Sequence, residues 1–233
     1  MRQISDKVFA EDFLFELELA TPLLPSPYAE RPYLVIEDFL DASLCRAIID
    51  TTQRDSDVVE AKLRSTQNTL DQKIRNTKIH RLSPHHQTLY DEALSNYRAE
   101  IEHFFTLSLT QSTQPQLLEY TKGSFYKAHA DDSSVLMDRV GTVAGFKQVA
   151  PQRKLTTLLF LSEYSTEADT PYQFSGGELT FNYLKDTQGE AVTLRPKMGT
   201  LLVFGSNPIY THEVKEVTAG YRLTLAQWHD AIL

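Results

Sequence analysis

The pattern of apolar and polar residues near the C-terminus predicts a strand that is covered on both sides. Residues 211–228 read as a strand, a glycine-containing turn and a second strand. Side chains alternate along a strand, so the last strand has Arg222, Thr224, Ala226 and Trp228 on one face, and Tyr221, Leu223, Leu225 and Gln227 on the other. Both faces are rather apolar, which is typical of a strand buried on both sides. Arg222 is therefore expected to point into the protein, where its charge needs an anionic partner.

Helical spacing of apolar residues marks two stretches in the N-terminal half. Asp41 is a candidate N-cap for a helix over residues 42–53. The positions at helical spacing in that stretch are Leu44, Ala47, Ile48 and Thr51. Ser83 before Pro84 predicts the start of a second, longer helix, because proline needs no amide partner at the first helical position. Its apolar stripe, which should pack against the strands, is Leu89, Ala93, Tyr97, Ile101 and Phe104.

The remaining N-terminal segments carry weaker patterns. Residues 33–36 read as a strand, and residues 54–80 are polar and predict no definite element. Residues 1–30 end in a proline-rich run that prevents a regular helix, so we expect an arm laid over the rest of the domain. No uninterrupted apolar stretch approaches the roughly 20 residues needed to span a bilayer, and no membrane partner is expected.

Composition indicates an ordinary globular chain. The 233 residues are 41% hydrophobic and 23% charged, which predicts one domain over residues 1–233. Cys45 is the only cysteine and no signal-like segment is evident, so we expect a cytoplasmic protein without disulfides. The formal net charge of −8 argues against nucleic-acid binding, which relies on a cationic face.

Candidate chemistry is concentrated in the second half of the chain. His129 and Asp131 are two residues apart, so both side chains would point to the same face of a strand. With His212 they make a set of two histidines and one carboxylate, which leaves adjacent positions of a non-haem Fe(II) open for a bidentate co-substrate and O2. Arg222 follows ten residues after His212, and its planar guanidinium suits a carboxylate, as a dicarboxylate co-substrate would supply. Each residue alone has an ordinary structural explanation, but the ordered set favours a metal centre.

Five other histidines lie outside this set, and two tyrosines near it allow two interpretations. Five histidines lack a comparable context and are expected to be structural or solvated: His80, His85, His86, His103 and His229. Tyr120 and Tyr126 are either packing aromatics or site residues. A regular strand would place both on the face opposite His129, unless Gly123 or a bulge resets the register.

The order His-x-Asp, distal His and a basic residue about ten positions later resembles the Fe(II)- and 2-oxoglutarate-dependent oxygenases, and within them the prolyl 4-hydroxylase-like group. Four flanking segments also resemble that family: residues 118–129, 157–162, 176–179 and 196–204. The resemblance covers roughly residues 115–230 and reaches loosely back to an opening strand and helix at residues 35–40.

The resemblance implies a double-stranded β-helix, that is, a jelly-roll barrel open at one end, in a mainly β chain with flanking helices (α+β). Residues 115–233 would form the catalytic core, and residues 1–114 the arm, opening strand and supporting helices. His129, Asp131 and His212 would bind Fe(II), and Arg222 would bind the distal carboxylate of 2-oxoglutarate. Ascorbate would be an additional cofactor.

The implied reaction is hydroxylation of an unactivated C–H bond, coupled to oxidative decarboxylation of 2-oxoglutarate to succinate and CO2. Retention of Asp131 favours hydroxylation, because halogenating relatives replace this carboxylate with a small residue; desaturation and ring closure stay open. Phe160 stands where some relatives have a co-substrate-binding tyrosine, so Thr224 or Tyr120 is expected to replace it. Trp228 stands where nucleic-acid demethylating relatives carry a second arginine, which argues against nucleobase repair.

The substrate is expected to be a prolyl or other aminoacyl residue of a peptide or protein, with a free amino acid or small metabolite as the alternative. Residues 132–153 are expected to form a lid loop over the barrel mouth. Basic residues in this segment and directly after it could recognise a carboxylate: Arg139, Lys147, Arg153 and Lys154. Two other classes stay open, a non-catalytic sensor module that binds metal or 2-oxoglutarate and a cupin-like metalloenzyme that needs no oxoacid.

Overall fold

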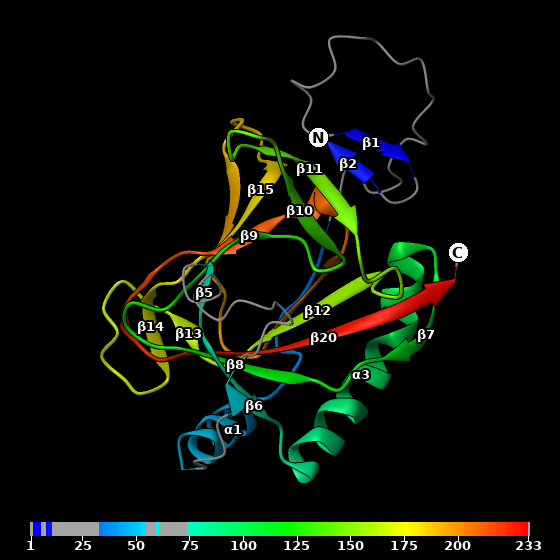
Figure 1. The fold of residues 1–233 in the computed structure, drawn as a ribbon. Coiled ribbons are helices and arrows are strands. Elements are labelled where there is room, and N and C mark those ends of the chain that lie inside the picture. The colour runs from blue at the N-terminus through cyan, green and yellow to red at the C-terminus, as the bar shows by residue number, and fades with distance from the viewer. Residues whose placement is uncertain (1, 6–7, 11–32, 55–58, 61–73, 233) are drawn as a thin grey trace.

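The computed structural model describes residues 2–5, 8–10, 33–54, 59–60 and 74–232. Two helices, α1 (Ala42–Arg54) and α3 (Pro84–Phe105), flank four groups of paired strands (Figure 1). Neither of these helices is long and apolar enough to cross a membrane. Most of the predicted N-terminal arm, including its proline-rich run, lies outside the described residues, which contain only its short strands β1 (Arg2–Ser5) and β2 (Val8–Ala10).

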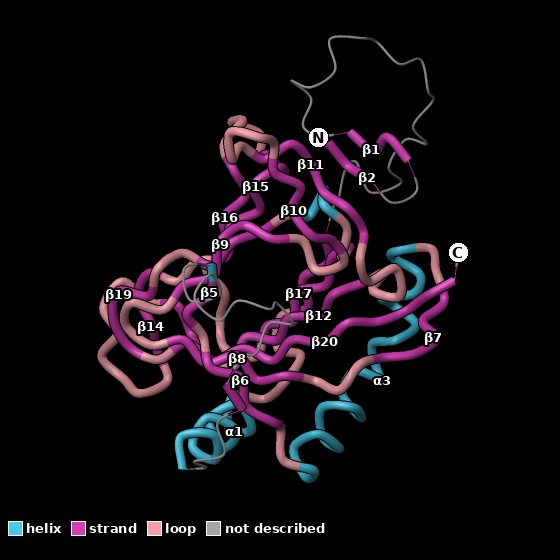
Figure 2. The backbone as a smooth tube through the Cα atoms, in the orientation of Figure 1, coloured by secondary structure: helices cyan, strands magenta, loops and turns pink. Residues whose placement is uncertain are grey.

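Two sheets face each other and form the predicted jelly roll (Figure 2). The larger sheet has the order β3 (Tyr33–Ile36), β17 (Thr200–Gly205), β12 (Leu155–Phe160), β20 (Arg222–Ile232), β8 (Gln116–Tyr120), β6 (Lys78–Arg81) and β4 (Val59–Glu60), and β7 (Ser108–Ser112) also pairs with β20. The smaller sheet has the order β16 (Ala191–Leu194), β15 (Leu179–Lys185), β18 (His212–Val214), β9 (Phe125–His129) and β5 (Arg75–Asn76). Strands from both halves of the chain share each sheet, so no sheet boundary falls at residue 114.

Two minor groups of strands complete the fold. One consists of β13 (Glu163–Tyr164), β14 (Gln173–Gly176) and β19 (Val217–Gly220). The other has the order β1, β2, β11 (Val143–Gln148) and β10 (Ser133–Met137). The prediction of a lid loop at residues 132–153 is therefore wrong in form, because most of this segment is a β-hairpin whose β11 strand also pairs with β2. The glycine-containing turn predicted before the last strand likewise includes a further strand, β19.

The large sheet separates two apolar cores. Leu223 and Leu225 of β20 belong to the cluster that also contains Ile48 of α1 and Ile101 of α3. Ala226, on the opposite face of β20, belongs to the cluster between the sheets. The predicted division of β20 into two faces is confirmed. Both helices lie against one side of this sheet, and β9, β10 and β15 lie on the other (Figure 1).

Both predicted helix starts are confirmed, while the predicted stripe of the first helix is correct for Leu44 and Ile48, which pack in the core, and wrong for Ala47 and Thr51. Asp41 Oδ1 accepts a 2.7 Å hydrogen bond from the Ser43 amide, and Ser83 Oγ accepts one of 3.3 Å from the His86 amide. In α1 the buried residues are Cys45, Ile48, Ile49 and Thr52, so only Ile48 of the predicted stripe is fully buried. In α3 the predicted Ile101 is buried, together with His86, Tyr90 and Phe105.

The hydroxyl of Tyr90 joins α3 to the large sheet, and its removal tests this connection. It lies 3.1 Å from Gln227 Oε1 and 3.2 Å from Thr157 Oγ1, in a site where Tyr90 is 1% exposed. Tyr90→Phe should lower the free energy of unfolding by about 1–2 kcal/mol in a urea titration, because buried polar groups lose a partner. Tyr97→Phe is the matched control: its ring packs on Phe39, and its hydroxyl makes no hydrogen bond within the described part of the chain. Equal losses in the two variants would contradict the role given to the Tyr90 hydroxyl.

Candidate metal centre

The pairing of β18 with β9 places two histidines side by side. His212 stands directly opposite His129 in the antiparallel register, and their ring centroids are 4.4 Å apart. The next registered pair is Val214 with Tyr126, so β9 holds one extra residue between the two pairs and forms a bulge. The bulge resets the alternation, and the Tyr126 ring consequently stacks on the His129 ring at 3.5 Å and 13°. The sequence left open whether a bulge would do this, and the structure has one.

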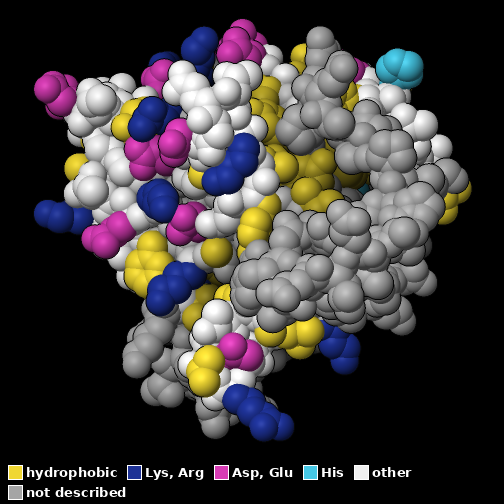
Figure 3. All heavy atoms as spheres, turned by 90° about the horizontal axis from the view of Figure 1, so that it is seen from above, with side chains coloured by type: hydrophobic (Ala, Val, Ile, Leu, Met, Phe, Trp, Pro, Cys, Tyr) yellow, Lys and Arg dark blue, Asp and Glu magenta, His cyan; other side chains and the backbone are white. Residues whose placement is uncertain are grey.

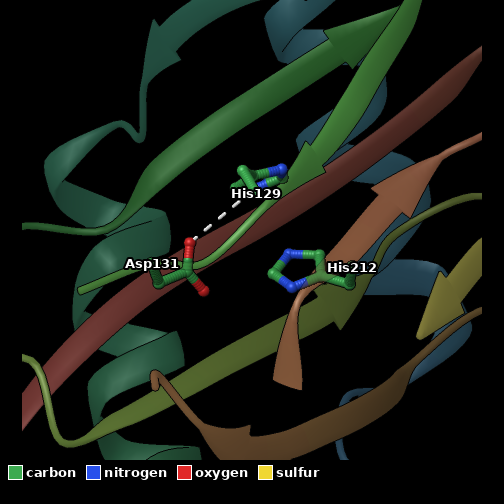
Figure 4. Close-up of side chains that lie close together, drawn as sticks. All are labelled: His129, Asp131 and His212. Atoms are coloured by element: carbon green, nitrogen blue, oxygen red, sulfur yellow. Dashed lines mark ion pairs between the residues drawn. The ribbon is translucent and has the colours of Figure 1, made fainter. Parts of the chain in front are cut away.

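Asp131 completes a cluster of three potential metal ligands. One ligand atom from each of His129, Asp131 and His212 lies within 4.8 Å of the others (Figure 4). Asp131 Oδ1 is 3.8 Å from His129 Nε2. The argument from one strand face is wrong in detail, because β9 ends at His129 and Asp131 lies in the bend that follows. The bend still points the carboxylate toward the imidazoles (Figure 4).

Backbone carbonyls fix the orientation of both imidazoles. His129 Nδ1 is 2.9 Å from the Lys127 carbonyl oxygen, and His212 Nδ1 is 2.9 Å from that of Tyr210. A carbonyl oxygen only accepts, so Nδ1 of each ring donates and carries the proton. Each neutral ring then has its lone pair on Nε2, the atom that is available to a metal.

Asp131 is held by a short chain of hydroxyl groups. Thr156 Oγ1 donates a 2.7 Å hydrogen bond to Asp131 Oδ2 and lies 2.9 Å from Ser206 Oγ. Arg153 donates from Nη1 to the Asp131 backbone carbonyl at 2.8 Å. Thr156 and Ser206 are 2% and 1% exposed, so both act in a site that excludes water. This support leaves Asp131 Oδ1 as the oxygen nearer to His129.

The protonation states also suit a metal. Burial, reinforced by the neighbouring His212, lowers the pKa of His129 to about 3, so this imidazole is neutral near pH 7. Burial acts to raise the pKa of Asp131, but the two imidazoles and the Thr156 hydroxyl outweigh it and hold the pKa below its usual range. A neutral imidazole and an ionised carboxylate are the forms that coordinate metals.

Arg222 is a buried cation without a carboxylate partner among the described residues. It is 1% exposed, and its Nε donates a 2.9 Å hydrogen bond to the Gly177 carbonyl. Both Nη atoms are buried without hydrogen-bond partners within the described chain. Its guanidinium carbon lies 4.8 Å from the Tyr120 ring centroid and 5.5 Å from that of Phe160. Burial lowers the pKa of Arg222 to about 10, and the side chain remains charged near pH 7.

The three candidate ligands and Arg222 line one pocket of 460 Å³. Its walls include His129, Asp131, His212 and Arg222, and also Tyr120 and Thr224. Thr224 Oγ1 is buried without a hydrogen-bond partner in the described part of the chain. Phe160 packs beside Arg222 but does not line this pocket.

The residues present fit both a divalent metal and an anionic co-substrate. Two Nε2 lone pairs and a carboxylate are a donor set suited to Fe(II). The two unpaired Nη atoms of Arg222 match the two oxygens of a carboxylate, and Thr224 Oγ1 supplies a further polar group on the same strand face. A dicarboxylate in this pocket would therefore meet donors that nothing in the described chain satisfies.

Several residues that contribute to the site were not singled out in the sequence. Thr156 and Ser206 were missed, although Thr156 lies two positions before Leu158 and four before Phe160 on a strand with alternating faces. Arg75 was missed because it stands in the polar stretch that predicted no definite element. Outside the site, His80 contacts Glu119 at 2.9 Å and His229 contacts Thr157 at 2.8 Å, which agrees with the structural roles expected for them.

Comparison with known proteins agrees with this geometry. Residues 115–230 match the family model described as 2OG-Fe(II) oxygenase superfamily. No curated protein matches the chain.

Similar solved structures include three prolyl hydroxylases, at identities that establish a shared fold. A Pseudomonas putida prolyl-4-hydroxylase is 24% identical with a TM-score of 0.62, covering 87% of this chain and 94% of that one. A prolyl hydroxylase from Trichoplax adhaerens, in complex with a hypoxia inducible factor oxygen degradation domain peptide fragment, is 19% identical with a TM-score of 0.61, covering 87% and 85%. The viral collagen prolyl hydroxylase of Paramecium Bursaria Chlorella virus-1, in a 2OG complex, is 18% identical with a TM-score of 0.58, covering 87% and 97%. The chain belongs to the 2OG-Fe(II) oxygenase superfamily, whose metal is Fe(II) and whose co-substrate is 2-oxoglutarate.

Proposed function

We propose that this protein is a 2-oxoglutarate-dependent dioxygenase that hydroxylates a prolyl residue in a peptide or protein. The observation that carries the proposal is the convergence, in one pocket, of the His129, Asp131 and His212 cluster with the unpaired guanidinium of Arg222. A metal-binding module without an oxoacid would gain nothing from a buried, unpaired arginine, which is costly to maintain.

Each residue has a defined task in this proposal. His129, Asp131 and His212 hold the Fe(II), which supplies the oxidative chemistry when 2-oxoglutarate and O2 are present. Arg222 binds the distal carboxylate of 2-oxoglutarate through its two Nη atoms, and Thr224 Oγ1 or the Tyr120 ring edge borders the same end of the pocket. Thr156 keeps the Asp131 carboxylate oriented. The apolar walls, such as Leu158 and Phe204, exclude water from the reacting atoms.

The Trp228 ring favours a prolyl substrate. Tyr126 and Trp228 both line the pocket, but His129 and Arg75 cover the Tyr126 ring, so Trp228 supplies the aromatic surface that suits the saturated ring of proline. Trp228 Nε1 and Arg153 Nε are buried without hydrogen-bond partners in the described part of the chain, and both can donate to peptide carbonyl oxygens. The Arg153 guanidinium lies 4.1 Å from the Trp228 ring centroid, so the two donors stand together. The peptide bound by the Trichoplax adhaerens protein offers a precedent for this substrate class.

The direct test is a screen of proline-containing peptides with Fe(II), 2-oxoglutarate and ascorbate. We expect peptide-dependent formation of succinate together with the gain of one oxygen atom in the peptide, detected by mass spectrometry. Asp131→Ala, which removes a ligand and leaves the other residues of the pocket walls unchanged, should abolish both products. Succinate formation stimulated only by a free amino acid would instead support the small-molecule alternative. Binding of 2-oxoglutarate without turnover of any substrate would support a sensor.

Replacing Arg222 tests the co-substrate site without requiring turnover. Wild type should gain thermal stability when 2-oxoglutarate is added in the presence of Zn(II), because a ligand that binds only the folded state stabilises it. Arg222→Met keeps an unbranched apolar stem but removes the guanidinium, and with it the charge and the fork. It should bind 2-oxoglutarate on the order of 100-fold more weakly, since truncation of one member of a buried charged pair costs about 2–5 kcal/mol. An undiminished 2-oxoglutarate shift in this variant would remove Arg222 from the proposed role.

Replacing Thr156 tests how Asp131 is oriented. Thr156→Val has nearly the same shape but cannot donate to Asp131 Oδ2. We expect its affinity for Zn(II), measured by calorimetry, to fall about 10–100-fold, the usual effect of removing a group that orients a metal ligand. Thr156→Ser keeps the hydroxyl and should restore most of the affinity. If valine and serine behave alike, the hydrogen bond does not support the metal site.

A further inference from the structure

The charges that line the pocket differ from those of the chain as a whole. The formal net charge of the chain is −8, and on the described part of the face in Figure 3 acidic and basic side chains lie intermingled. Among the described residues that line the pocket, three are arginines, Arg75, Arg153 and Arg222, and the only carboxylate is that of Asp131. An acidic protein therefore carries a positively charged pocket.

The proposed cofactors do not neutralise this charge. A divalent cation and the 2-oxoglutarate dianion cancel each other, and Asp131 offsets Arg222. Among the described residues that line the pocket, no further anion then compensates Arg75 and Arg153. Asp132 is close in sequence, but its carboxylate bonds to Ser133 and Gln148 and it does not line the pocket. This positive charge would attract a negatively charged group of a substrate in the rest of the pocket.

Arg75 is placed beside the metal cluster by strand pairing. It stands opposite Tyr126 in the pairing of β5 with β9, and its guanidinium carbon lies 4.6 Å from the Tyr126 ring centroid. The other side of that ring stacks on His129 at 3.5 Å. Guanidinium, phenol and imidazole thus form three layers. The two spacings together correspond to about two residues of an extended chain plus part of a side chain.

The guanidinium of Arg75 is held in place without an acidic partner. Its Nε is buried with no hydrogen bond to the described chain, and no carboxylate there lies within ion-pair distance of it. The contact with Tyr126 orients it, because the face of an aromatic ring attracts a cation. That contact leaves the in-plane N–H groups available. A planar fork with free in-plane donors is suited to a carboxylate.

We propose that Arg75 recognises a carboxylate of the substrate, located about two residues from the carbon that is hydroxylated. This inference rests on the proposed function and narrows it: the preferred peptide has an aspartate or glutamate next to the prolyl residue or one position further away. Arg153, on the Trp228 side, reinforces the preference through its charge. Long-range attraction to an acidic segment also speeds encounter, so the effect should weaken as salt is added.

The test uses Trp228, the only tryptophan of the chain, as a reporter inside the pocket. Blocked five-residue peptides with a central proline, and with glutamate, glutamine or lysine one or two positions away, are titrated against protein loaded with Zn(II) and 2-oxoglutarate. Quenching of tryptophan fluorescence gives the affinity without turnover. We expect the best glutamate peptide to bind about tenfold more tightly than its glutamine counterpart, and the lysine peptide to bind most weakly.

Variants of Arg75 distinguish the effect of its charge on the peptide preference from the effect of its shape. Arg75→Gln should reduce the preference for glutamate to less than about twofold, and Arg75→Lys should keep most of it. Arg75→Glu should reverse the order and favour the lysine peptide. Lys122→Gln is the matched control, because Lys122 is exposed and does not line the pocket. That variant removes the same charge and should keep the wild-type preference.

The outcomes distinguish this inference from the proposed function. Equal binding of the three peptides by wild type, or an unchanged preference in Arg75→Gln, would overturn the inference even if the neutral peptides are hydroxylated. Binding of N-acetylproline and of its amide tests the small-molecule alternative in the same assay. If only N-acetylproline binds, and binding depends on Arg75, the carboxylate recognition stands while the peptide part of the proposed function fails. Binding of none of these probes would overturn the inference.

Discussion

Alternation of side chains across the large sheet is the constraint on which the rest of the structure depends. On β20, Leu223 and Leu225 face the helices and complete an apolar core, while Arg222 and Thr224 face the pocket. The same division holds in β12. Leu159 packs in that core, and the side chains on the opposite face of the strand support the metal cluster. A one-residue slip of either strand would exchange these faces. One packed sheet therefore supports the fold and positions the polar groups of the site.

The buried polar groups of the pocket lower the stability of the folded chain when no ligand is bound. They also make the pocket selective for charged ligands. Arg222 is buried with two unpaired donors, and burial alone lowers its pKa to about 10. Gly177 reduces part of this cost by accepting from Arg222 Nε, and its positive φ of 63° places it in a conformation that suits glycine. A Cβ there would lie 2.8 Å from Val217 Cγ2 and 3.1 Å from Arg222 Cδ, so a larger residue would also crowd the arginine. Ligands that supply carboxylates would relieve the remaining cost.

Much of the site could be predicted from the sequence, because its ligands lie in ordered, patterned segments. The spacing of His129, Asp131, His212 and Arg222, together with the resemblance that it supports, indicated the residues that the structure brings together. The sequence could not reveal the bulge in β9, because an extra residue in a strand leaves no local signature; it depends on the pairing with β18. The hairpin at residues 132–153 was read as a loop because its exposed strand β10 includes apolar residues such as Leu136 and Met137 without a clear alternation. Arg75 lies in a two-residue strand, which is too short for any periodic pattern.

The central claim is that His129, Asp131, His212 and Arg222 form one Fe(II) and 2-oxoglutarate site. The most direct measurement is an anaerobic titration of the Fe(II)-loaded protein with 2-oxoglutarate, followed through the weak visible metal-to-ligand charge-transfer band. The account predicts a saturable band in the wild type and none in a folded His212→Ala variant. Absence of the band in folded, metal-loaded wild type would contradict the claim.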